Sequence, residues 1–408
     1  MQRKSYAAGL ADLLLFSIQT VLRRWFCREY LNFICTVCSA WWHMCKCKTE
    51  SIFVIAEAGV NHNGSRNLAF ELIDVAIEAG ANAVKFQTFT AENLVTRNAA
   101  KADYQKQTTN ADESQLAMLK RLELSHDTHR ELIAYCNEEG IEFLSTAFDS
   151  NSLNFLVNGL GLETLKVPSG EITNGPFLLE YARSGCDLII STGMATLGEV
   201  EEALGVIAFG LIHSRDSSIQ PSREVFRQVY SSSEGQQLLK KKVTLLHCTT
   251  EYPAPIGDIN FKAMQTMRSA FGLKIGYSDH SEGVTIPIAV AALGALVIEK
   301  HFTLDKTLPG PDHKASLEPN ELKEMVIAIR TVEQAMGNGL KHPMPSELGN
   351  RNIARKSLVA ADNIKSNDIF TAENLTIKRP GTGRSPMEYW EILGTEAQND
   401  HSEDEAIA

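Results

Sequence analysis

Two histidines, His280 and His301, end consecutive apolar runs of the chain, KIGYSDH and ALVIEKH. If the runs are neighbouring parallel strands, both imidazoles can hold one divalent cation and leave positions open for water and substrate. Two protein ligands bind a metal weakly, so we expect the ion to exchange. Each histidine could instead be a hydrogen-bonded structural residue, but the nearby acids Asp279, Glu299 and Asp312 favour a metal pair.

Two lysines interrupt other apolar runs: Lys85 in AVKFQTF and Lys166 in TLKVPSG. A buried ammonium group is costly without an anionic partner, so we expect both to bind a phosphate or carboxylate of a substrate. The alternative is an internal ion pair with Glu57 or Glu171, and the two states can alternate without and with substrate. Further donors follow the runs and can add to an anion site: Ser169, Ser191, Thr192, Gly193 and Ser278.

Three glutamates, Glu57, Glu171 and Glu299, lie at or near the ends of apolar runs. Acids there are often structural, but three beside lysines and a metal indicate general acid–base catalysis and contacts to sugar hydroxyls. Gln87 belongs to the same set. Cys248, at the end of an apolar run, could be a nucleophile, but no His–Asn or His–Asp arrangement supports that role beyond the neighbouring His247.

The elements that must position these residues are short strands. Continuous apolar runs are typical of parallel strands buried on both faces, and the segments between them carry helical periodicity, as in 68–80, which ends at Gly80. A (β/α)8 TIM barrel follows, and its strand ends would bring the polar residues to one mouth. The runs are IFVIAEAGV (52–60), AVKFQTF (83–89), EFLSTAF (142–148), TLKVPSG (164–170), DLIISTG (187–193), VTLLHCT (243–249), KIGYSDH (274–280) and ALVIEKHF (295–302).

The chain has 408 residues, enough for a barrel of about 250 residues and a smaller domain. We expect a catalytic barrel over 51–337, with a helical excursion at 194–242, and a Pro/Gly-rich linker over 338–350. A small domain at 351–400 would contain the strands KSLVA and NLTIKR, and an acidic, frayed tail would follow at 401–408.

Residues 1–50 differ in composition from the rest, with five of the eight cysteines and three of the four tryptophans. We interpret them as an extension outside the fold, with the working protein starting near Met44. The extension could hold a zinc cluster formed by Cys35, Cys38, His43, Cys45 and Cys47. Their irregular spacing argues against such a site. Membrane contact is expected only if this extension is part of the working protein, since its apolar stretch 10–22 is too short to span a bilayer.

The net charge of −11 and pI near 5.5 argue against a nucleic-acid partner, which would usually meet a basic face. The remaining cysteines, Cys136, Cys186 and Cys248, are widely separated in the sequence. We interpret them as reduced packing residues of a cytoplasmic protein.

The motifs resemble those of the sialic acid synthase (N-acetylneuraminate synthase) family, in order and over about residues 52–396. They are IAEAGVNHNG, VKFQTF, LKVPSGE, STGMAT, LHCTTEYPAP, GYSDH, EKHFTLDKTLPGPDH and KRPGTGRSP. The resemblance implies a TIM barrel followed by an antifreeze-like SAF domain, in a domain-swapped homodimer. It implies condensation of phosphoenolpyruvate with N-acetylmannosamine to N-acetylneuraminate and phosphate, with Mn²⁺, Mg²⁺ or Co²⁺. LHCTTEYPAP and 194–242 also resemble relatives that make legionaminic acids from a 2,4-diacetamido-2,4,6-trideoxymannose.

The resemblance also implies roles for individual residues. His280 and His301 would hold the metal, and either the metal or a carboxylate such as Glu57 or Glu299 would activate water. Phosphoenolpyruvate would be bound by Lys85, Lys166, Ser169 and Ser278, with Thr146 a weaker contact and Ser191 among the donors. Gln87, Tyr252, Glu171 and Asp312 would contact the sugar or order the site, and Arg379 would reach the sugar of the other chain. Thr250 departs from the asparagine of some members.

Two other functions stay open at this point. A metal-dependent aldolase or lyase on the same barrel would need no phosphoenolpyruvate and would release no phosphate. A sugar-binding protein with a decayed site is the second, although His280, His301, Lys85 and Lys166 are all intact.

Overall fold

The computed structural model describes residues 51–407, except 103–104, 107–108, 110–112 and 215–217. The interpretations of residues 1–50 therefore lie outside the described residues. The chain divides into two compact units at Met336/Gly337, and each is described by itself.

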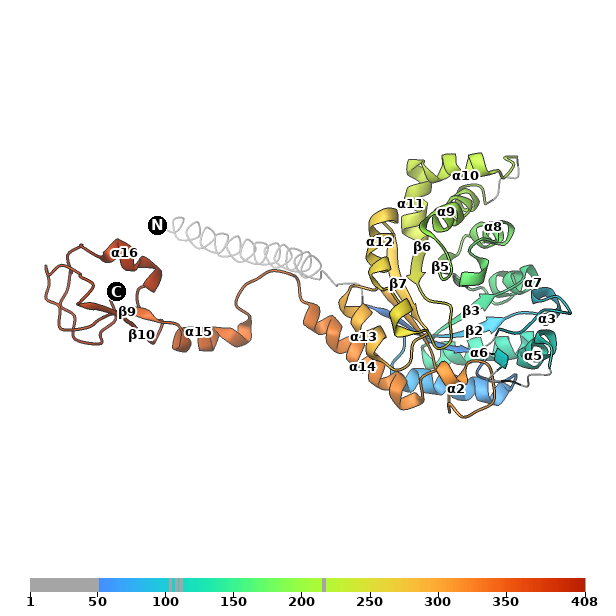
Figure 1. Ribbon diagram of the computed structural model, residues 1–408, viewed down its shortest axis with the longest axis horizontal. Helices are drawn as coiled ribbons and strands as arrows, with labels where there is room; N and C mark the ends of the chain where they lie inside the picture. Colours follow the sequence, from blue (N-terminus) through green and yellow to red (C-terminus); the bar gives the residue numbers. More distant parts are fainter. Residues whose placement is uncertain (1–50, 103–104, 107–108, 110–112, 215–217, 408) are drawn as a thin grey trace, which may run out of the picture. The chain divides into compact units, whose positions relative to one another are not determined.

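The first unit is a closed barrel of eight parallel strands in sequence order, β1 to β8, as the apolar runs predicted (Figure 1). β8 pairs with β1 in parallel and closes the barrel, with His301 opposite Glu57. The strands are β1 Phe53–Gly59, β2 Ala83–Thr88, β3 Glu142–Ala147, β4 Thr164–Val167, β5 Asp187–Ser191, β6 Val243–His247, β7 Lys274–Asp279 and β8 Val297–His301.

Helices surround the barrel, and their ends follow local sequence signals. In α2, the Ser65 hydroxyl accepts a hydrogen bond from the Leu68 backbone N–H, and Gly80 ends the helix in the left-handed region at φ 78°. The helices are α2 Arg66–Ala79, α3 Ala91–Leu94, α5 Gln115–Leu122, α6 His126–Glu139, α7 Ser150–Asn154, α8 Gly175–Arg183, α9 Leu197–Ile212, α10 Arg223–Tyr230, α11 Ser233–Lys242, α12 Lys262–Phe271, α13 Thr285–Ala292 and α14 Pro319–Met336.

The excursion at 194–242 is helical, as expected. It consists of α9, α10 and α11, and α9 packs against both of the others and against α8. A capping box between Thr196 and Glu199 fixes the start of α9.

Inside the barrel an apolar layer supports a polar one. Six apolar side chains form a separate buried cluster: Ile55, Ala83, Leu144, Ile189, Leu246 and Val297. Because alternate residues of a strand share one face, the residues two positions further on also face inward: Glu57, Lys85, Thr146, Ser191, Cys248 and Glu299. The period of the strand therefore places the polar layer above an apolar floor.

The second unit contains α15 Leu348–Ala354, the antiparallel pair β9 Ser357–Ala360 and β10 Leu375–Lys378, and α16 Tyr389–Ile392. Its core includes Leu358, Phe370 and Ile407. The expected frayed tail is wrong: the Ile407 N–H donates to the Leu358 carbonyl, and His401 exchanges backbone hydrogen bonds with Ile364. These pairs outweigh the acidic composition because they satisfy backbone groups against a buried core.

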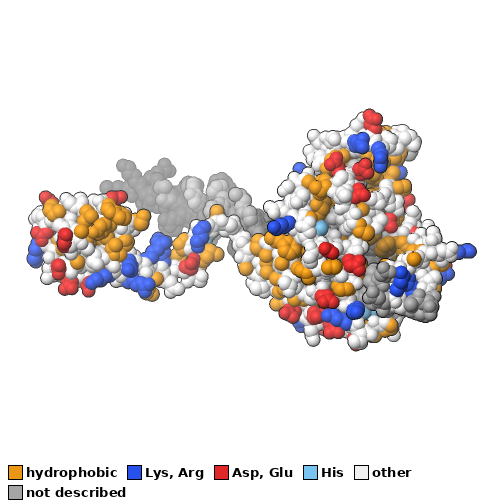
Figure 2. All heavy atoms as spheres, viewed as in Figure 1, with side chains coloured by type: hydrophobic (Ala, Val, Ile, Leu, Met, Phe, Trp, Pro, Cys, Tyr) orange, Lys and Arg blue, Asp and Glu red, His pale blue; other side chains and the backbone are white. Residues whose placement is uncertain are grey.

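No helix within the described ranges is long and apolar enough to cross a membrane. On the face drawn in Figure 2, acidic and basic side chains of the barrel are interspersed.

Candidate active site

A cavity of about 290 Å³ opens at the carboxyl ends of the barrel strands. Its lining includes nearly all residues that the sequence nominated for chemistry, contributed by every strand end of the barrel. They are Glu57, Lys85, Gln87, Thr146, Lys166, Ser169, Ser191, Tyr252, Ser278, His280, Glu299, His301 and Asp312.

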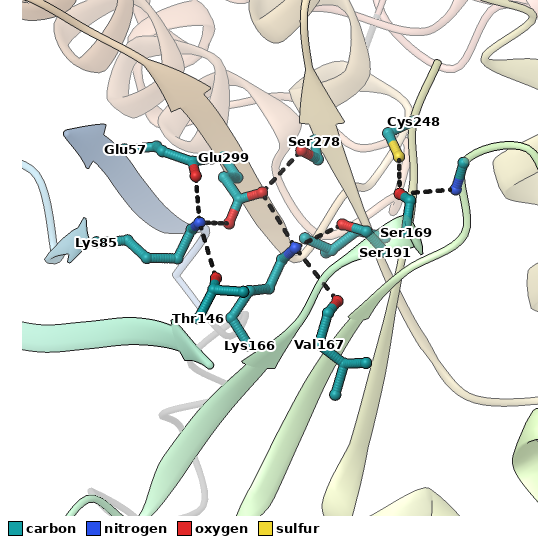
Figure 3. A network of polar contacts seen from close by, with 12 residues as sticks. Glu57, Lys85, Thr146, Lys166, Val167, Ser169, Ser191, Cys248, Ser278 and Glu299 are labelled. Carbon is teal, nitrogen blue, oxygen red and sulfur yellow. Dashed lines mark hydrogen bonds and ion pairs between the residues drawn. The ribbon is translucent and has the colours of Figure 1, made fainter. Parts of the chain in front are cut away.

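Two buried ammonium groups share one carboxylate at the base of the cavity. Glu299 lies between them in Figure 3, 3.7 Å from the Lys85 Nζ and 3.5 Å from the Lys166 Nζ. Lys85 also donates to Glu57, and Lys166 donates to the Ser191 hydroxyl at 2.7 Å. The internal Lys–Glu pairs anticipated from the sequence are therefore present, with Glu299 in the place expected for Glu171.

The charges around Glu57 and Lys85 control the ionisation of these two side chains. Burial alone would raise the pKa of Glu57, but the charges of His301, Lys85 and Lys166 outweigh it and hold the pKa well below its usual range. Burial opposes the charge on Lys85, yet the carboxylates of Glu299 and Glu57 raise its pKa. Both lysines are almost fully buried, so their ammonium groups lie at the base of the cavity with little exposure to solvent.

His280 and His301 lie side by side, with ring centres 5.6 Å apart. The Nδ1 of His280 is 2.6 Å from the Thr249 carbonyl oxygen, which can only accept, so Nδ1 carries the proton and Nε2 keeps its lone pair. The Nε2 of His301 lies 3.3 Å from a Glu57 carboxylate oxygen, so that nitrogen donates. Burial, followed by the charge of His301, lowers the pKa of His280 to about 3, which leaves it neutral as a metal ligand must be.

The donor set fits a divalent ion held by two protein ligands. The Nδ1 of His301 is a buried ring nitrogen with no hydrogen-bond partner, on the ring next to that of His280, whose Nε2 carries a lone pair. Among the described residues, no group of three His, Cys, Asp or Glu side chains is arranged to hold a metal. Any ion here would take its remaining ligands from water and substrate.

Hydroxyl and backbone donors gather on the β4–β7 side of the mouth. The Ser169 hydroxyl accepts from the Gly193 N–H at 3.1 Å and lies 3.1 Å from the Cys248 sulfur. The Thr250 hydroxyl lines the cavity, buried and unpartnered, so it is available to a ligand. Burial raises the pKa of Cys248, so its thiol stays protonated and the nucleophile interpretation loses its basis.

Asp312 differs from the other acids of the cavity. Burial raises its pKa, which favours the protonated, proton-donating form more than at Glu57.

Beside the histidines, the Tyr252 hydroxyl lies 3.2 Å from the His280 Nε2 and can donate to it.

Four nominated residues of the barrel are absent from the cavity lining: Glu171, Asp279, Thr192 and Gly193. Glu171 follows β4 in a short 3₁₀ turn and accepts from the Asn174 side chain, outside the cavity lining. Asp279 points to the opposite face of β7 from Ser278 and His280, so it is not at the metal pair. Arg379 belongs to the second unit, where it is exposed.

Sequence reasoning missed the apolar part of the lining. Val60, Met118, Leu119, Leu122 and Phe148 face the cavity together with the polar groups. Met118, Leu119 and Leu122 come from α5, which lies in a connection between β2 and β3 and not at a strand end. Helical spacing of apolar residues in 115–122 was the available signal, but it indicates only that one face is buried.

Lys300 and Asp279 form a fully buried ion pair, with 2.6 Å between the ammonium nitrogen and a carboxylate oxygen. They face each other across β7 and β8, each next in sequence to a cavity histidine. We expect Lys300→Met to lower the free energy of unfolding by about 3–5 kcal/mol, because Asp279 would keep a buried, unpaired charge. Urea denaturation measures this.

Asp279→Asn combined with Lys300→Met should recover part of that loss, since no charge remains. Lys120→Met, which breaks an exposed pair with Glu92, is the control and should change stability little. A loss no larger than that of the control would contradict the assignment.

Comparison with known proteins decides the family. Residues 72–341 match the NeuB family, and residues 355–408 match the SAF domain. The chain belongs to the NeuB family. It is therefore an enzyme of the sialic and legionaminic acid synthase group, as the motifs indicated.

Similar proteins span most of this NeuB-family chain. It is 51% identical to the N,N'-diacetyllegionaminic acid synthase of Campylobacter jejuni over 88% of this chain and 99% of that protein. It is 45% identical to the same-named enzyme of Legionella pneumophila, over 84% and 89%. The solved N-acetylneuraminic acid (sialic acid) synthetase of Leptospira borgpetersenii, in complex with citrate, aligns with a TM-score of 0.58 at 33% identity. That alignment covers 74% of this chain and 90% of that one.

Proposed function

We propose that this protein condenses phosphoenolpyruvate with 2,4-diacetamido-2,4,6-trideoxymannose and water, giving N,N'-diacetyllegionaminic acid and phosphate. The observation that carries the proposal is the polar layer of the cavity, where Lys85 and Lys166 lie beside His280 and His301. Two buried cations suit a small, multiply charged anion, and the histidine pair suits a substrate carbonyl next to a metal.

The relatives support the trideoxy sugar over N-acetylmannosamine as the substrate. The sequence motifs alone indicate N-acetylmannosamine, with the trideoxy sugar as the alternative. The names of the relatives at 51% and 45% identity favour the alternative. The reaction type is the same for both sugars.

The lysines and serines of the cavity would bind and orient phosphoenolpyruvate. Lys85 and Lys166 would hold the carboxylate and phosphate of phosphoenolpyruvate, with Ser169, Ser191 and Ser278 donating to the remaining oxygens. This arrangement fixes the enol C3 of phosphoenolpyruvate against the aldehyde carbon of the open-chain sugar, so that the new C–C bond forms by proximity and orientation. Thr146, which accepts from Lys85 at 3.3 Å, orients that ammonium group.

The acidic residues would act as general base and general acid. Glu57 or Glu299, both buried beside the lysines, would take a proton from the water that adds at C2. Asp312, with its raised pKa, would donate to the alkoxide formed from the aldehyde or contact the sugar with Gln87 and Tyr252. Phosphate would then leave by cleavage of the C2–O bond. Mn²⁺, Mg²⁺ or Co²⁺ held by His280 and His301 would polarise the aldehyde oxygen as a Lewis acid.

The direct test is phosphate release from phosphoenolpyruvate with Mn²⁺, comparing the trideoxy sugar with N-acetylmannosamine. We expect faster release with the trideoxy sugar and a matching acid by mass spectrometry. Release only with N-acetylmannosamine would move the chain to the sialic acid branch. Sugar cleavage without phosphate release would instead support the lyase alternative.

We further propose a homodimer, in the cytoplasm, in which Arg379 of one chain serves the barrel of the other. The support is the family resemblance and the exposure of Arg379 on the second unit; the free, buried Cys136, Cys186 and Cys248 suit a reducing compartment.

Mixing Arg379→Ala with His280→Ala chains should restore part of the activity that each variant lacks, because one mixed site would be intact. The measurement is phosphate release after co-refolding or co-expression. Activity no higher than the mean of the separate variants would place Arg379 in its own chain's site, or outside any site.

A further inference from the structure

We propose that an apolar wall over the ends of β1–β3 selects the deoxygenated, doubly acetylated sugar; this inference rests on the proposed function. The wall consists of Val60, Met118, Leu119, Leu122 and Phe148, all of which line the cavity.

The wall is a packed structure and not a set of scattered side chains. Val60, Met118 and Leu122 are buried in one cluster with Phe89, and Leu119 and Phe148 pack against it. α5, which carries three of the wall residues, is capped at its N-terminus by Ser114, whose hydroxyl accepts from the Ala117 N–H. α3 packs beside α5, and both lie near the ends of β2 and β3 (Figure 1).

The wall and the hydroxyl donors of the anion site occupy different arcs of the mouth. Val60 follows β1, Phe148 follows β3, and α5 lies between β2 and β3. The hydroxyls of Ser169, Ser191, Thr250 and Ser278 come from the ends of β4 to β7, and the strands follow one another in order around the barrel. Phosphoenolpyruvate would take the arc with these hydroxyls and would also reach Lys85 and Thr146, which lie within β2 and β3. The apolar side chains that follow β1 and β3, together with those of α5, are left for the sugar.

The two sugars differ where an apolar wall can discriminate. The trideoxy sugar has a methyl group at C6 in place of hydroxymethyl, and an acetamido group at C4 in place of a hydroxyl. Each change adds a methyl group or removes a hydroxyl, so each favours contact with aliphatic side chains. Discrimination of this kind is bounded, since an apolar pocket rejects an added hydroxyl by only about 10²-fold.

Leu119 is the residue to change, because it lines the cavity and is only half-buried. Leu116 offers a matched control: it is about one turn earlier on α5, also half-buried, and absent from the lining. The quantity to compare is the ratio of kcat/KM for the trideoxy sugar to kcat/KM for N-acetylmannosamine.

We expect Leu119→Ser to lower this ratio by about tenfold, while the KM for phosphoenolpyruvate is unchanged. Leu119→Met should keep the ratio, and so should Leu116→Ser. Leu119→Ala, which adds no polar group, should lower the ratio less and replaces the serine variant if that variant does not fold. An unchanged ratio in Leu119→Ser and Leu119→Ala, or an equal fall in Leu116→Ser, would contradict the proposed role of the apolar wall in selecting the sugar. A wild-type enzyme that releases no phosphate with either sugar would overturn the proposed function itself.

Discussion

Replacing His280 with alanine is expected to lower kcat by about 10³-fold and to weaken Mn²⁺ binding at the same time. The His280 Nε2 lone pair is one of two protein donors available to the ion, so its loss leaves His301 alone. A Lewis-acid metal supplies several kcal/mol of stabilisation to the developing charge, and each ~1.4 kcal/mol is tenfold in rate. Steady-state kinetics and Mn²⁺ titration by electron paramagnetic resonance measure the two effects.

His247→Gln is the matched control for that variant. His247 ends the neighbouring strand β6, but its Nε2 contacts the Ile259 carbonyl at 2.8 Å and it does not line the cavity. Its replacement should leave Mn²⁺ affinity unchanged. Normal Mn²⁺ affinity in His280→Ala would refute the two-histidine site.

Replacing Lys166 with methionine should lower kcat/KM for phosphoenolpyruvate by about 10²–10³-fold, with most of the change in KM. The methionine keeps the volume of the lysine stem but removes the charge that faces the Ser191 hydroxyl and Glu299. Loss of one member of a buried charge pair costs a few kcal/mol in binding. Initial rates at varied phosphoenolpyruvate and saturating sugar measure the effect.

The control for Lys166→Met is Lys242→Met. Lys242 pairs with Asp187, away from the cavity, so this change tests only the loss of a positive charge elsewhere on the barrel. A KM for phosphoenolpyruvate that is normal in Lys166→Met would exclude Lys166 as an anion-binding group.

Much of this site could be predicted because strand geometry is simple. Eight continuous apolar runs indicated eight buried strands, and barrel closure brings their carboxyl ends to one mouth. The alternation of side chains then fixes which residues face inward. It places Ser278 and His280 in the cavity and sends Asp279 to the opposite face, where Lys300 neutralises it; applied strictly, it would have excluded Asp279 beforehand.

The remaining features depend on geometry that has no strand period. Glu171 lies in a 3₁₀ turn, so its direction does not follow from β4. The apolar wall comes from α5, whose position over the mouth is set by packing in the tertiary structure. The acidic end of the second unit is ordered by backbone pairs such as Ile407 to Leu358, which composition does not reveal.

The most direct test of the central claim uses phosphoenolpyruvate labelled with ¹⁸O in the oxygen that bridges C2 and phosphorus. With the trideoxy sugar and Mn²⁺, the account predicts that the released phosphate carries the label, because the C2–O bond breaks and the nonulosonic acid takes its C2 oxygen from water. Unlabelled phosphate with the label retained in the acid would contradict the proposed chemistry, and so would the absence of phosphate from folded, metal-loaded enzyme.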